Sequence, residues 1–172
     1  SLSINGKKMH IPFGSSLPGF ANGLGRLNDM EYRYDGNFIN RSAIQPDAAK
    51  LLQLTAQWLN APYMWGGRTI LGVDCSGFVQ VNYKMMGIDL ARDAWQQAQQ
   101  GRRIKKLKEA VCGDLAFFDD KDEIVHVGIL LGPGQIIHAS GKVRIDEIDK
   151  KGIIRTDTGA RTHFLRSIKR YW

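Results

Sequence analysis

The chain has 172 residues, of which 43% are hydrophobic and 24% are charged, and its net charge is +7. A chain of this length and composition can bury the core of one domain together with a fragment of another, and it is not a disordered tail. No apolar run approaches the roughly 18 residues of a membrane span, and the first residues contain no signal-peptide hydrophobic region. We therefore expect a globular chain without a transmembrane segment, although a missing signal does not fix the compartment.

The positive charge predicts attraction to an anionic surface or polymer, of which nucleic acid and bacterial cell wall are two examples. The basic residues are scattered, and no helix-turn-helix, zinc-finger or RNA-binding aromatic motif accompanies them. We therefore predict no nucleic-acid partner. The two cysteines, Cys75 and Cys112, are too few for a disulfide framework, and a chemically active Cys75 would leave Cys112 without a partner.

Residues 1–45 are rich in glycine, and turn-forming residues such as Pro18-Gly19 separate short apolar pieces. This pattern predicts short strands and loops, either an arm of the main domain or the remnant of a small β-barrel. At Pro46 the pattern becomes helical, because proline suits the first helical position and apolar residues then recur at spacings of three and four. We predict a domain boundary before Pro46 and a helix over 46–59.

The rest of the chain, residues 46–172, has helical spacing first and alternating spacing afterwards. After the first helix, the pattern predicts helices over 75–86 and 93–100, each ended by a glycine. Alternation after Gly113 predicts strands over 114–118, 123–131, 135–139, 142–148 and 163–172. Helices followed by an antiparallel sheet indicate an α+β domain.

Cys75 lies where a glycine-broken loop, residues 63–72, leads into the second predicted helix. Unpaired backbone N–H groups and the helix dipole favour a thiolate on the first turn of a helix. Cys75 is therefore a candidate nucleophile. The alternative is that it is a small buried apolar residue, as free cysteines commonly are.

Two histidines, His126 and His138, lie on adjacent predicted strands. They share a face of the hairpin only if the loop between the strands has an odd number of residues. A three-residue loop over 132–134 would place His126 opposite Ser140, so that His138 becomes its diagonal neighbour within hydrogen-bonding reach. A four-residue loop would put the two imidazoles on opposite faces. If the two histidines act together, the loop must therefore have an odd number of residues.

With that geometry, His126 would take the proton of Cys75 and later protonate the leaving amine, while His138 would orient His126 and fix its tautomer. Each histidine taken alone could instead be an ordinary core or edge residue, and His10 and His163 receive no role. One cysteine and two histidines can also ligate zinc, but no fourth ligand or standard ligand spacing is recognisable. We therefore predict a Cys-His-His triad without a metal or other cofactor.

Five short segments support this prediction through their order along the chain. They are Pro62-Tyr63-Met64-Trp65-Gly66-Gly67, Asp74-Cys75-Ser76-Gly77-Phe78, Gly113-Asp114-Leu115-Ala116-Phe117-Phe118, His126-Val127-Gly128-Ile129 and Ile137-His138-Ala139-Ser140. In this order they resemble the NlpC-type bacterial cell-wall cysteine peptidases. The resemblance covers about residues 46–148. It implies a papain-like fold, in which a helix with the nucleophile packs on an antiparallel sheet with two histidines.

The resemblance also implies a reaction, hydrolysis of peptidoglycan stem peptides, commonly between the γ-carboxyl group of D-glutamate and a diamino acid. In such enzymes the residue matching Tyr63 supports the nucleophile site, and the one matching Asp74 receives the free amino end of trimmed peptides. The residue matching Ser76 contacts the D-glutamyl part. Arg92 matches a recurrent arginine, whose planar fork suits a carboxylate. The implied partners are stem peptides or released muropeptides.

Two residues depart from the family pattern, and the first part of the chain has a separate likeness of its own. Cys112 stands where the family usually has a proline, and we interpret it as structural. Ala94 stands where a serine is often seen, so one hydrogen bond to the substrate is absent. Residues 1–45 resemble the end of a bacterial SH3-like domain, which often precedes this type of peptidase.

Other functions remain open at this point. The same triad could serve acyl transfer or thioester hydrolysis, but that would require a wide apolar cleft, whereas the surroundings of Asp74, Ser76 and Arg92 are polar. A non-catalytic wall-binding module is a further alternative, against which the intact Cys75, His126 and His138 argue. The expected location is the cell envelope, the periplasm or outside the cell, and a cytoplasmic recycling role is also open.

Overall fold

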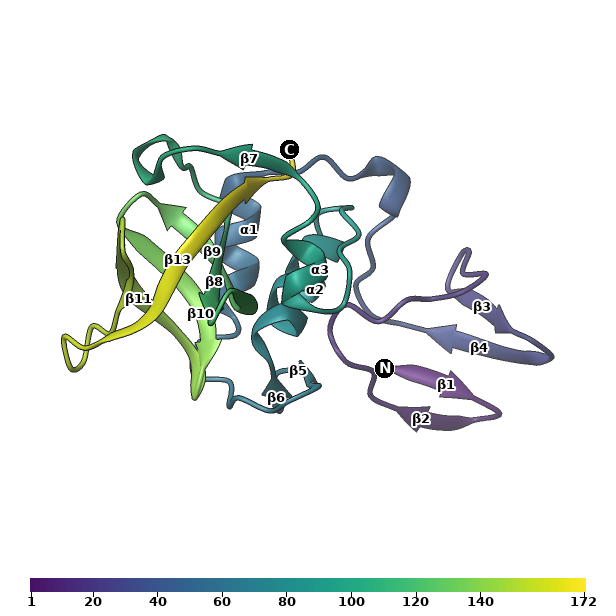
Figure 1. The fold of residues 1–172 in the computed structure, drawn as a ribbon. Coiled ribbons are helices and arrows are strands. Elements are labelled where there is room, and N and C mark those ends of the chain that lie inside the picture. Colours follow the sequence, from purple (N-terminus) through teal and green to yellow (C-terminus); the bar gives the residue numbers. More distant parts are fainter. The chain divides into compact units, whose positions relative to one another are not determined.

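The computed structural model describes residues 1–172, and the chain forms two compact units, Ser1–Ile44 and Gln45–Trp172 (Figure 1). The boundary lies one residue before the point where the sequence predicts a change, between residues 45 and 46. No helix is long and apolar enough to cross a membrane.

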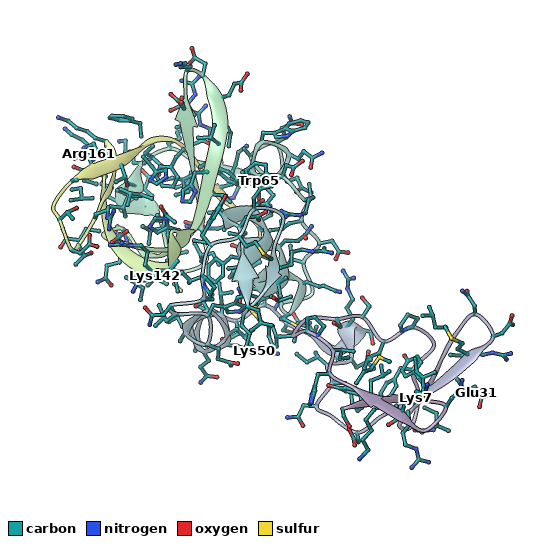
Figure 2. The ribbon with its side chains drawn as sticks, turned by 90° about the horizontal axis from the view of Figure 1, so that it is seen from below. Lys7, Glu31, Lys50, Trp65, Lys142 and Arg161 are labelled. Atoms are coloured by element: carbon teal, nitrogen blue, oxygen red, sulfur yellow. The ribbon has the colours of Figure 1, made fainter.

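The first unit is a four-stranded antiparallel sheet with the strand order β2-β1-β4-β3. Its strands are β1 (Leu2–Ile4), β2 (Lys7–Met9), β3 (Leu24–Leu27) and β4 (Met30–Tyr34), followed by a 3-10 turn at Arg41–Ala43. Tyr32 is its main buried side chain, and its hydroxyl donates to the backbone oxygen of Pro18 at 2.7 Å. Lys7 and Glu31 are exposed on β2 and β4 (Figure 2). This small sheet agrees with the predicted short strands.

The second unit contains three α-helices, α1 (Ala48–Ala56), α2 (Cys75–Lys84) and α3 (Ala94–Gln97), and a 3-10 turn at Leu107–Glu109. The first helix begins after Asp47, whose carboxylate accepts the backbone N–H of Lys50 at 2.7 Å, so Pro46 precedes the helix and is not its first residue. The prediction of a helix over 93–100 was wrong in length, because α3 is a single turn.

Most of the second unit is one antiparallel sheet with the strand order β12-β11-β10-β9-β8-β13-β7. Its strands are β7 (Arg102–Ile104), β8 (Leu115–Asp120), β9 (Glu123–Gly132), β10 (Gln135–Ser140), β11 (Lys142–Asp149), β12 (Gly152–Ile154) and β13 (Arg161–Arg170). Because β12 also pairs with β13, the strands from β8 to β13 close into a barrel, and β7 adds to the edge of β13. A separate hairpin of β5 (Arg68–Thr69) and β6 (Gly72–Val73) precedes α2.

Two apolar cores lie on the two faces of this sheet. The larger one packs α1 and α2 against the outer face of β8, β9 and β10, with Trp58 and Phe78 in an edge-to-face contact at 5.8 Å between ring centroids. The smaller one fills the barrel with residues such as Phe118, Leu130 and Ile136. Each fully buried side chain of this size contributes about 1.5 to 3 kcal/mol. The cores hold α2 against β9 and β10, which carry the two histidines (Figure 1).

The last strand is tied to the entry of β8 by a buried ion pair. The carboxylate of Asp114, which is 1% exposed, accepts from Arg170 Nε at 2.7 Å and from Arg170 Nη2 at 2.8 Å. It also accepts the backbone N–H of Val111 at 2.9 Å. The Gly113-Asp114 segment of the sequence pattern is therefore a structural clamp in this chain.

We expect Arg170→Ala to lower the free energy of unfolding by about 3 kcal/mol, because it leaves the buried carboxylate of Asp114 without its charged partner. Urea denaturation measures the change. Arg166→Ala is the matched control on the same strand, since Arg166 is 56% exposed and lies 3.6 Å from Asp119. That exposed pair should contribute no more than about 1 kcal/mol. Equal losses in the two variants would contradict the clamp.

Candidate active site

The nucleophile candidate occupies the first position of α2. Asp74 caps this helix, and its Oδ1 atom accepts the backbone N–H of Gly77 at 2.6 Å. A Cβ atom at Gly77 would lie 2.4 Å from the backbone oxygen of Gly67, so only glycine allows the loop to approach the helix this closely. The Asp-Cys-Ser-Gly segment thus fixes both the start of the helix and the place of Cys75.

The thiol of Cys75 is buried, with 8% of the residue exposed. Burial raises the pKa of Cys75, and hydrogen bonds from backbone N–H groups, that of Val127 first, oppose this shift only in part. The expectation that the helix N-terminus favours a thiolate was therefore wrong in its net direction, because desolvation outweighs it. The resting thiol is protonated at neutral pH and needs a base.

The turn between β9 and β10 differs from the prediction, but the register is the predicted one. Gly132 pairs with Gln135 around a two-residue turn, and the ladder then shifts, so that Leu130 pairs with Ile136 and Ile129 with Ile137. The bulge adds the one residue that the shorter turn lacks. Continued along the strands, this register sets His126 opposite Ser140, as a three-residue loop would have done.

The predicted hydrogen bond between the two imidazoles is present. His126 Nε2 lies 2.8 Å from His138 Nδ1, and both residues are buried. A Cβ atom at Gly128 would lie 2.7 Å from Ile136 Cδ1 and 2.8 Å from Cβ of His138, so the glycine of the His-Val-Gly-Ile segment lets these two residues of β10 pack against β9. Because Val127 donates its backbone N–H to the Cys75 sulfur, His126 adjoins the residue that contacts the nucleophile.

A carboxylate extends this pair, and the sequence analysis missed it. His138 Nε2 lies 3.0 Å from Oδ2 of Asp146 on β11. The signal was present in the pairing of β10 with β11, where His138 pairs with Arg144. Since residues two apart on a strand share a face, Asp146 lies on the same face as His138. The parity argument used for the histidines would have found it.

Asp146, only 1% exposed, is itself held by Arg144 on the same strand and by Thr156, which follows β12. Its Oδ1 atom accepts from Arg144 Nη2 at 2.8 Å and from the backbone N–H of Thr156 at 3.0 Å. Burial opposes ionisation, but the hydrogen bonds from His138 and Arg144 outweigh it and hold the pKa of Asp146 well below its usual range. The ionised carboxylate of Asp146 is therefore the last member of a hydrogen-bonded chain that runs from His126 through His138.

A third histidine contacts the site, although the sequence analysis gave it no role. His163 on β13 stacks on His126, with ring centroids 4.2 Å apart and an angle of 25° between the planes. Burial lowers the pKa of His163 to about 4. Burial also lowers the pKa of His126 well below 6.5, and the repulsion between its protonated form and any charge on His138 or His163 adds to this shift. His126 is therefore a neutral base at neutral pH. No group of three or more histidine, cysteine or acidic residues is arranged to hold a metal ion.

The four residues expected on the substrate side lie together beside Cys75. Arg92, in the loop before α3, binds both carboxylate oxygens of Asp74, and its Nη1 also donates to Ser76 Oγ at 2.9 Å. The backbone N–H of Gly66 donates to the same carboxylate at 2.8 Å. Burial raises the pKa of Tyr63, and the negative charges of Cys75 and Asp74 add to this shift, so its phenol lies near both.

The remaining candidates lie elsewhere. His10 belongs to the first unit, just after β2. Cys112 is partly buried, and burial and the charge of Asp114 raise its pKa, so it is a weakly reactive thiol beside the clamp. Ala94, where a serine was noted as frequent in the family, is buried at the start of α3.

Comparison with known proteins agrees with this geometry. The model of the NlpC/P60 family matches residues 60–162, which is more than half of the chain. The chain belongs to the NlpC/P60 family. Its fold is therefore the papain-like α+β type that the sequence pattern indicated, here with the sheet closed into a barrel.

Two curated relatives illustrate the likeness. A gamma-D-glutamyl-L-lysine dipeptidyl-peptidase of Bacillus subtilis (strain 168) is 33% identical over 144 residues, which are 77% of this chain and 47% of that protein. A probable endopeptidase NlpC homolog of Haemophilus influenzae is 36% identical over 148 residues, which are 84% of this chain and 78% of that protein. The chain thus spans about half the length of the Bacillus subtilis relative.

Among solved structures, an NlpC/P60 family protein from Bacillus cereus aligns with 99% of this chain and 59% of its own, at a TM-score of 0.75 and 28% identity. The NlpC/p60 domain of the peptidoglycan hydrolase SagA aligns with 73% of this chain and 99% of its own, at a TM-score of 0.58 and 26% identity. These family members carry the same fold as the second unit.

The buried histidines predict a loss of stability in acid. The unfolded chain binds protons on His126 and His163 near pH 6.5, whereas the folded chain keeps both neutral to lower pH. Because the unfolded state then holds more protons, the free energy of unfolding falls as the pH falls from 6.5 toward about 4.

His163→Phe should make this loss shallower, since it keeps a stacked ring and removes one of the two titrating groups. Urea unfolding of both proteins at about pH 7 and about pH 5 measures the slope. His10→Gln is the matched control, because His10 lies outside the site. An unchanged slope in His163→Phe would contradict the assignment.

Proposed function

We propose that this chain is a cysteine peptidase that hydrolyses peptidoglycan stem peptides at the bond between the γ-carboxyl group of D-glutamate and a diamino acid. The observation that carries the proposal is the hydrogen-bonded pair of His126 and His138 on the hairpin against which Cys75 packs. The name of the Bacillus subtilis relative supports the choice of bond, as does the same name, gamma-D-glutamyl-L-lysine dipeptidyl-peptidase, of a Bacillus cereus protein that is 35% identical over 124 residues.

The reaction begins with a proton transfer. His126 uses Nε2 to contact His138, so its Nδ1 atom takes the proton of Cys75 while the sulfur attacks the scissile carbonyl carbon. The negative oxygen that forms is stabilised by backbone N–H groups at the start of α2, where those of Cys75 and Ser76 face the sulfur. His126 then gives its proton to the leaving amine, and water hydrolyses the thioester with His126 again as the base.

The polar group beside Cys75 supports a peptide substrate with a free amino end. A buried ammonium group needs a carboxylate partner, and Asp74 presents one that is ionised, because hydrogen bonds from Arg92, Gly77 and Gly66 outweigh its burial and lower its pKa. Since Arg92 already binds this carboxylate, the ammonium group shares it with Arg92. Ser76 and Arg92 then face the α-carboxylate of the D-glutamyl residue.

The alternative of a thioesterase or acyltransferase for lipids finds less support in this site. The side chains nearest to Cys75 on the helix side, Asp74, Ser76 and Arg92, are polar and form an ionic network. A long acyl chain would leave these groups desolvated without partners. The same network, with the intact histidine pair, supports an enzyme over a non-catalytic wall-binding module.

The setting follows from the same proposal. We infer that the first unit is the end of an SH3-like domain that adjoins the peptidase domain in sequence. The substrate is either intact wall in the cell envelope, the periplasm or the medium, or released muropeptides, for which a cytoplasmic recycling role is the alternative. The name of an Escherichia coli relative that is 34% identical over 93 residues, a murein DD-endopeptidase and LD-carboxypeptidase, supports the envelope.

We expect Cys75→Ala to abolish hydrolysis of an L-Ala-γ-D-Glu-diamino-acid peptide, because no other side chain replaces the nucleophile. Mass spectrometry of the peptide after incubation detects the products, and circular dichroism checks the fold. Cys112→Ala is the matched control and should keep its activity, since Cys112 lies outside the site. Unchanged cleavage by Cys75→Ala, or no cleavage by the wild type, would refute the proposed function.

Acetylation of the substrate's amino end should lower kcat/KM for the wild type by about 100-fold, because it removes the charge that pairs with Asp74. Asp74→Asn should lose most of this discrimination while keeping α2 intact, since asparagine is as good a helix cap as aspartate. Competing free and acetylated peptides in one assay give the ratio directly. A wild-type enzyme that cuts both peptides equally would remove Asp74 from the substrate site.

A further inference from the structure

We propose that Asp146 fixes the tautomers of both histidines, so that His126 always presents an unprotonated nitrogen to Cys75. Asp146 is then a positioning residue, since it acts on the nucleophile through two imidazoles and touches neither the substrate nor the sulfur. The proposal deepens the peptidase function proposed above and rests on it for its consequence in catalysis. The direction of the hydrogen bonds follows from these contacts, with Asp146 ionised and both imidazoles neutral, and needs no substrate.

The partners of the Asp146 carboxylate determine where His138 carries its proton. Oδ1 of Asp146 accepts two hydrogen bonds, from Arg144 Nη2 at 2.8 Å and from the backbone N–H of Thr156 at 3.0 Å. An ionised carboxylate only accepts hydrogen bonds, so Oδ2, at 3.0 Å from His138 Nε2, accepts as well. His138 must therefore carry its proton on Nε2.

The next bond in the chain is then determined. A neutral imidazole has one N–H group, so His138 with its proton on Nε2 has an unprotonated Nδ1. This atom lies 2.8 Å from His126 Nε2, which must be the donor. His126 in turn has its proton on Nε2 and a free electron pair on Nδ1. Each bond from Asp146 to His126 thus points the same way, and Nδ1 is the nitrogen left for Cys75.

The same chain stabilises the charge that forms during the reaction. When His126 takes the proton of Cys75, both of its nitrogens carry hydrogen, and the bond to His138 stays intact without any rearrangement. The positive charge then lies two hydrogen bonds from a fixed carboxylate in a buried site, where such interactions are strong. Asp146 need not accept a proton at any step.

Asparagine at position 146 would reverse the direction of each hydrogen bond between this residue, His138 and His126. At the Oδ1 position the asparagine oxygen keeps two hydrogen bonds, from Thr156 and Arg144 Nη2, whereas at the Oδ2 position it would keep only the 2.8 Å ionic contact with Arg144 Nε. The amide nitrogen therefore faces His138 Nε2. That nitrogen donates, which moves the proton of His138 to Nδ1 and the proton of His126 to Nδ1 as well. His126 would then meet Cys75 with an N–H group, and the thiol would have no base.

The activities of two variants separate tautomer control from a structural role. Reversing the tautomer of a base that an aspartate contacts directly costs about 10⁴ in kcat, so we expect Asp146→Asn to lose about 10²- to 10³-fold in kcat through one intervening histidine. Asp146→Ala removes the bias and leaves the productive tautomer partly populated, so its loss should be only about 2- to 10-fold.

Stability should change in the opposite order. Asparagine keeps the hydrogen bonds to Thr156 and Arg144, whereas alanine loses them, so Asp146→Ala should be the less stable variant in urea. With kcat measured where both variants are folded, the less stable one is thus expected to be the more active. If kcat instead follows stability, with Asp146→Ala the slower enzyme, Asp146 has a structural role only and the proposal is overturned.

A spectroscopic measurement on the wild type tests the two tautomers directly. Two-bond ¹⁵N–¹H correlation spectra identify which ring nitrogen of each histidine carries the proton, and single-histidine variants assign the signals. We expect the proton on Nε2 of both His126 and His138. A proton on Nδ1 of either residue would overturn the proposal even if the peptide is cleaved, whereas Nε2 protons without any cleavage would refute only the peptidase function.

Discussion

The pairing register of β9 against β10 is the constraint on which the rest of the site depends. A slip by one residue would turn every side chain of a strand to its other face. His138 would then point into the core against α2 and lose both His126 and Asp146. The bulge after the two-residue turn sets this register, and Gly128 leaves space for Ile136 and for Cβ of His138. The pairing of β9 with β10 therefore determines which of their side chains can meet, whatever rotamers those side chains adopt.

Closure of the sheet meets a second requirement, because it shields the charge of Asp146 from water. Asp146 is fully enclosed because β11, β12 and β13 complete the barrel around it, and its remaining hydrogen bonds come from Arg144 and Thr156. A buried carboxylate with fewer donors would take up a proton, and its control of the histidines would end. The barrel, an addition to the predicted sheet, is thus what allows an anion to stand behind two neutral imidazoles.

Much of this could be predicted from the sequence, and the failures have specific physical causes. The predicted register of β9 against β10 was correct although the predicted three-residue turn was wrong. A two-residue turn followed by a one-residue bulge gives the same register as a three-residue turn. Asp146 was within reach of the same argument, which was applied to the two histidines and not to the strand that follows them. The strands β7 and β12 have three residues each, too few for an alternating pattern. The pairing of Arg92 with Asp74 depends on a tertiary approach that no local pattern encodes.

The pKa of Cys75 shows how two sound local arguments can compete. A helix N-terminus favours the thiolate, yet burial favours the thiol, and in this site burial prevails. The pKa of His126 is lowered for the same reason, so the resting pair is neutral on both sides. In the reaction proposed above, charge develops only as the sulfur attacks, so the backbone N–H groups at the start of α2 and the chain ending at Asp146 would act mainly on the transition state. Interactions that strengthen only there raise kcat, whereas a preformed ion pair would already have used them in the resting enzyme.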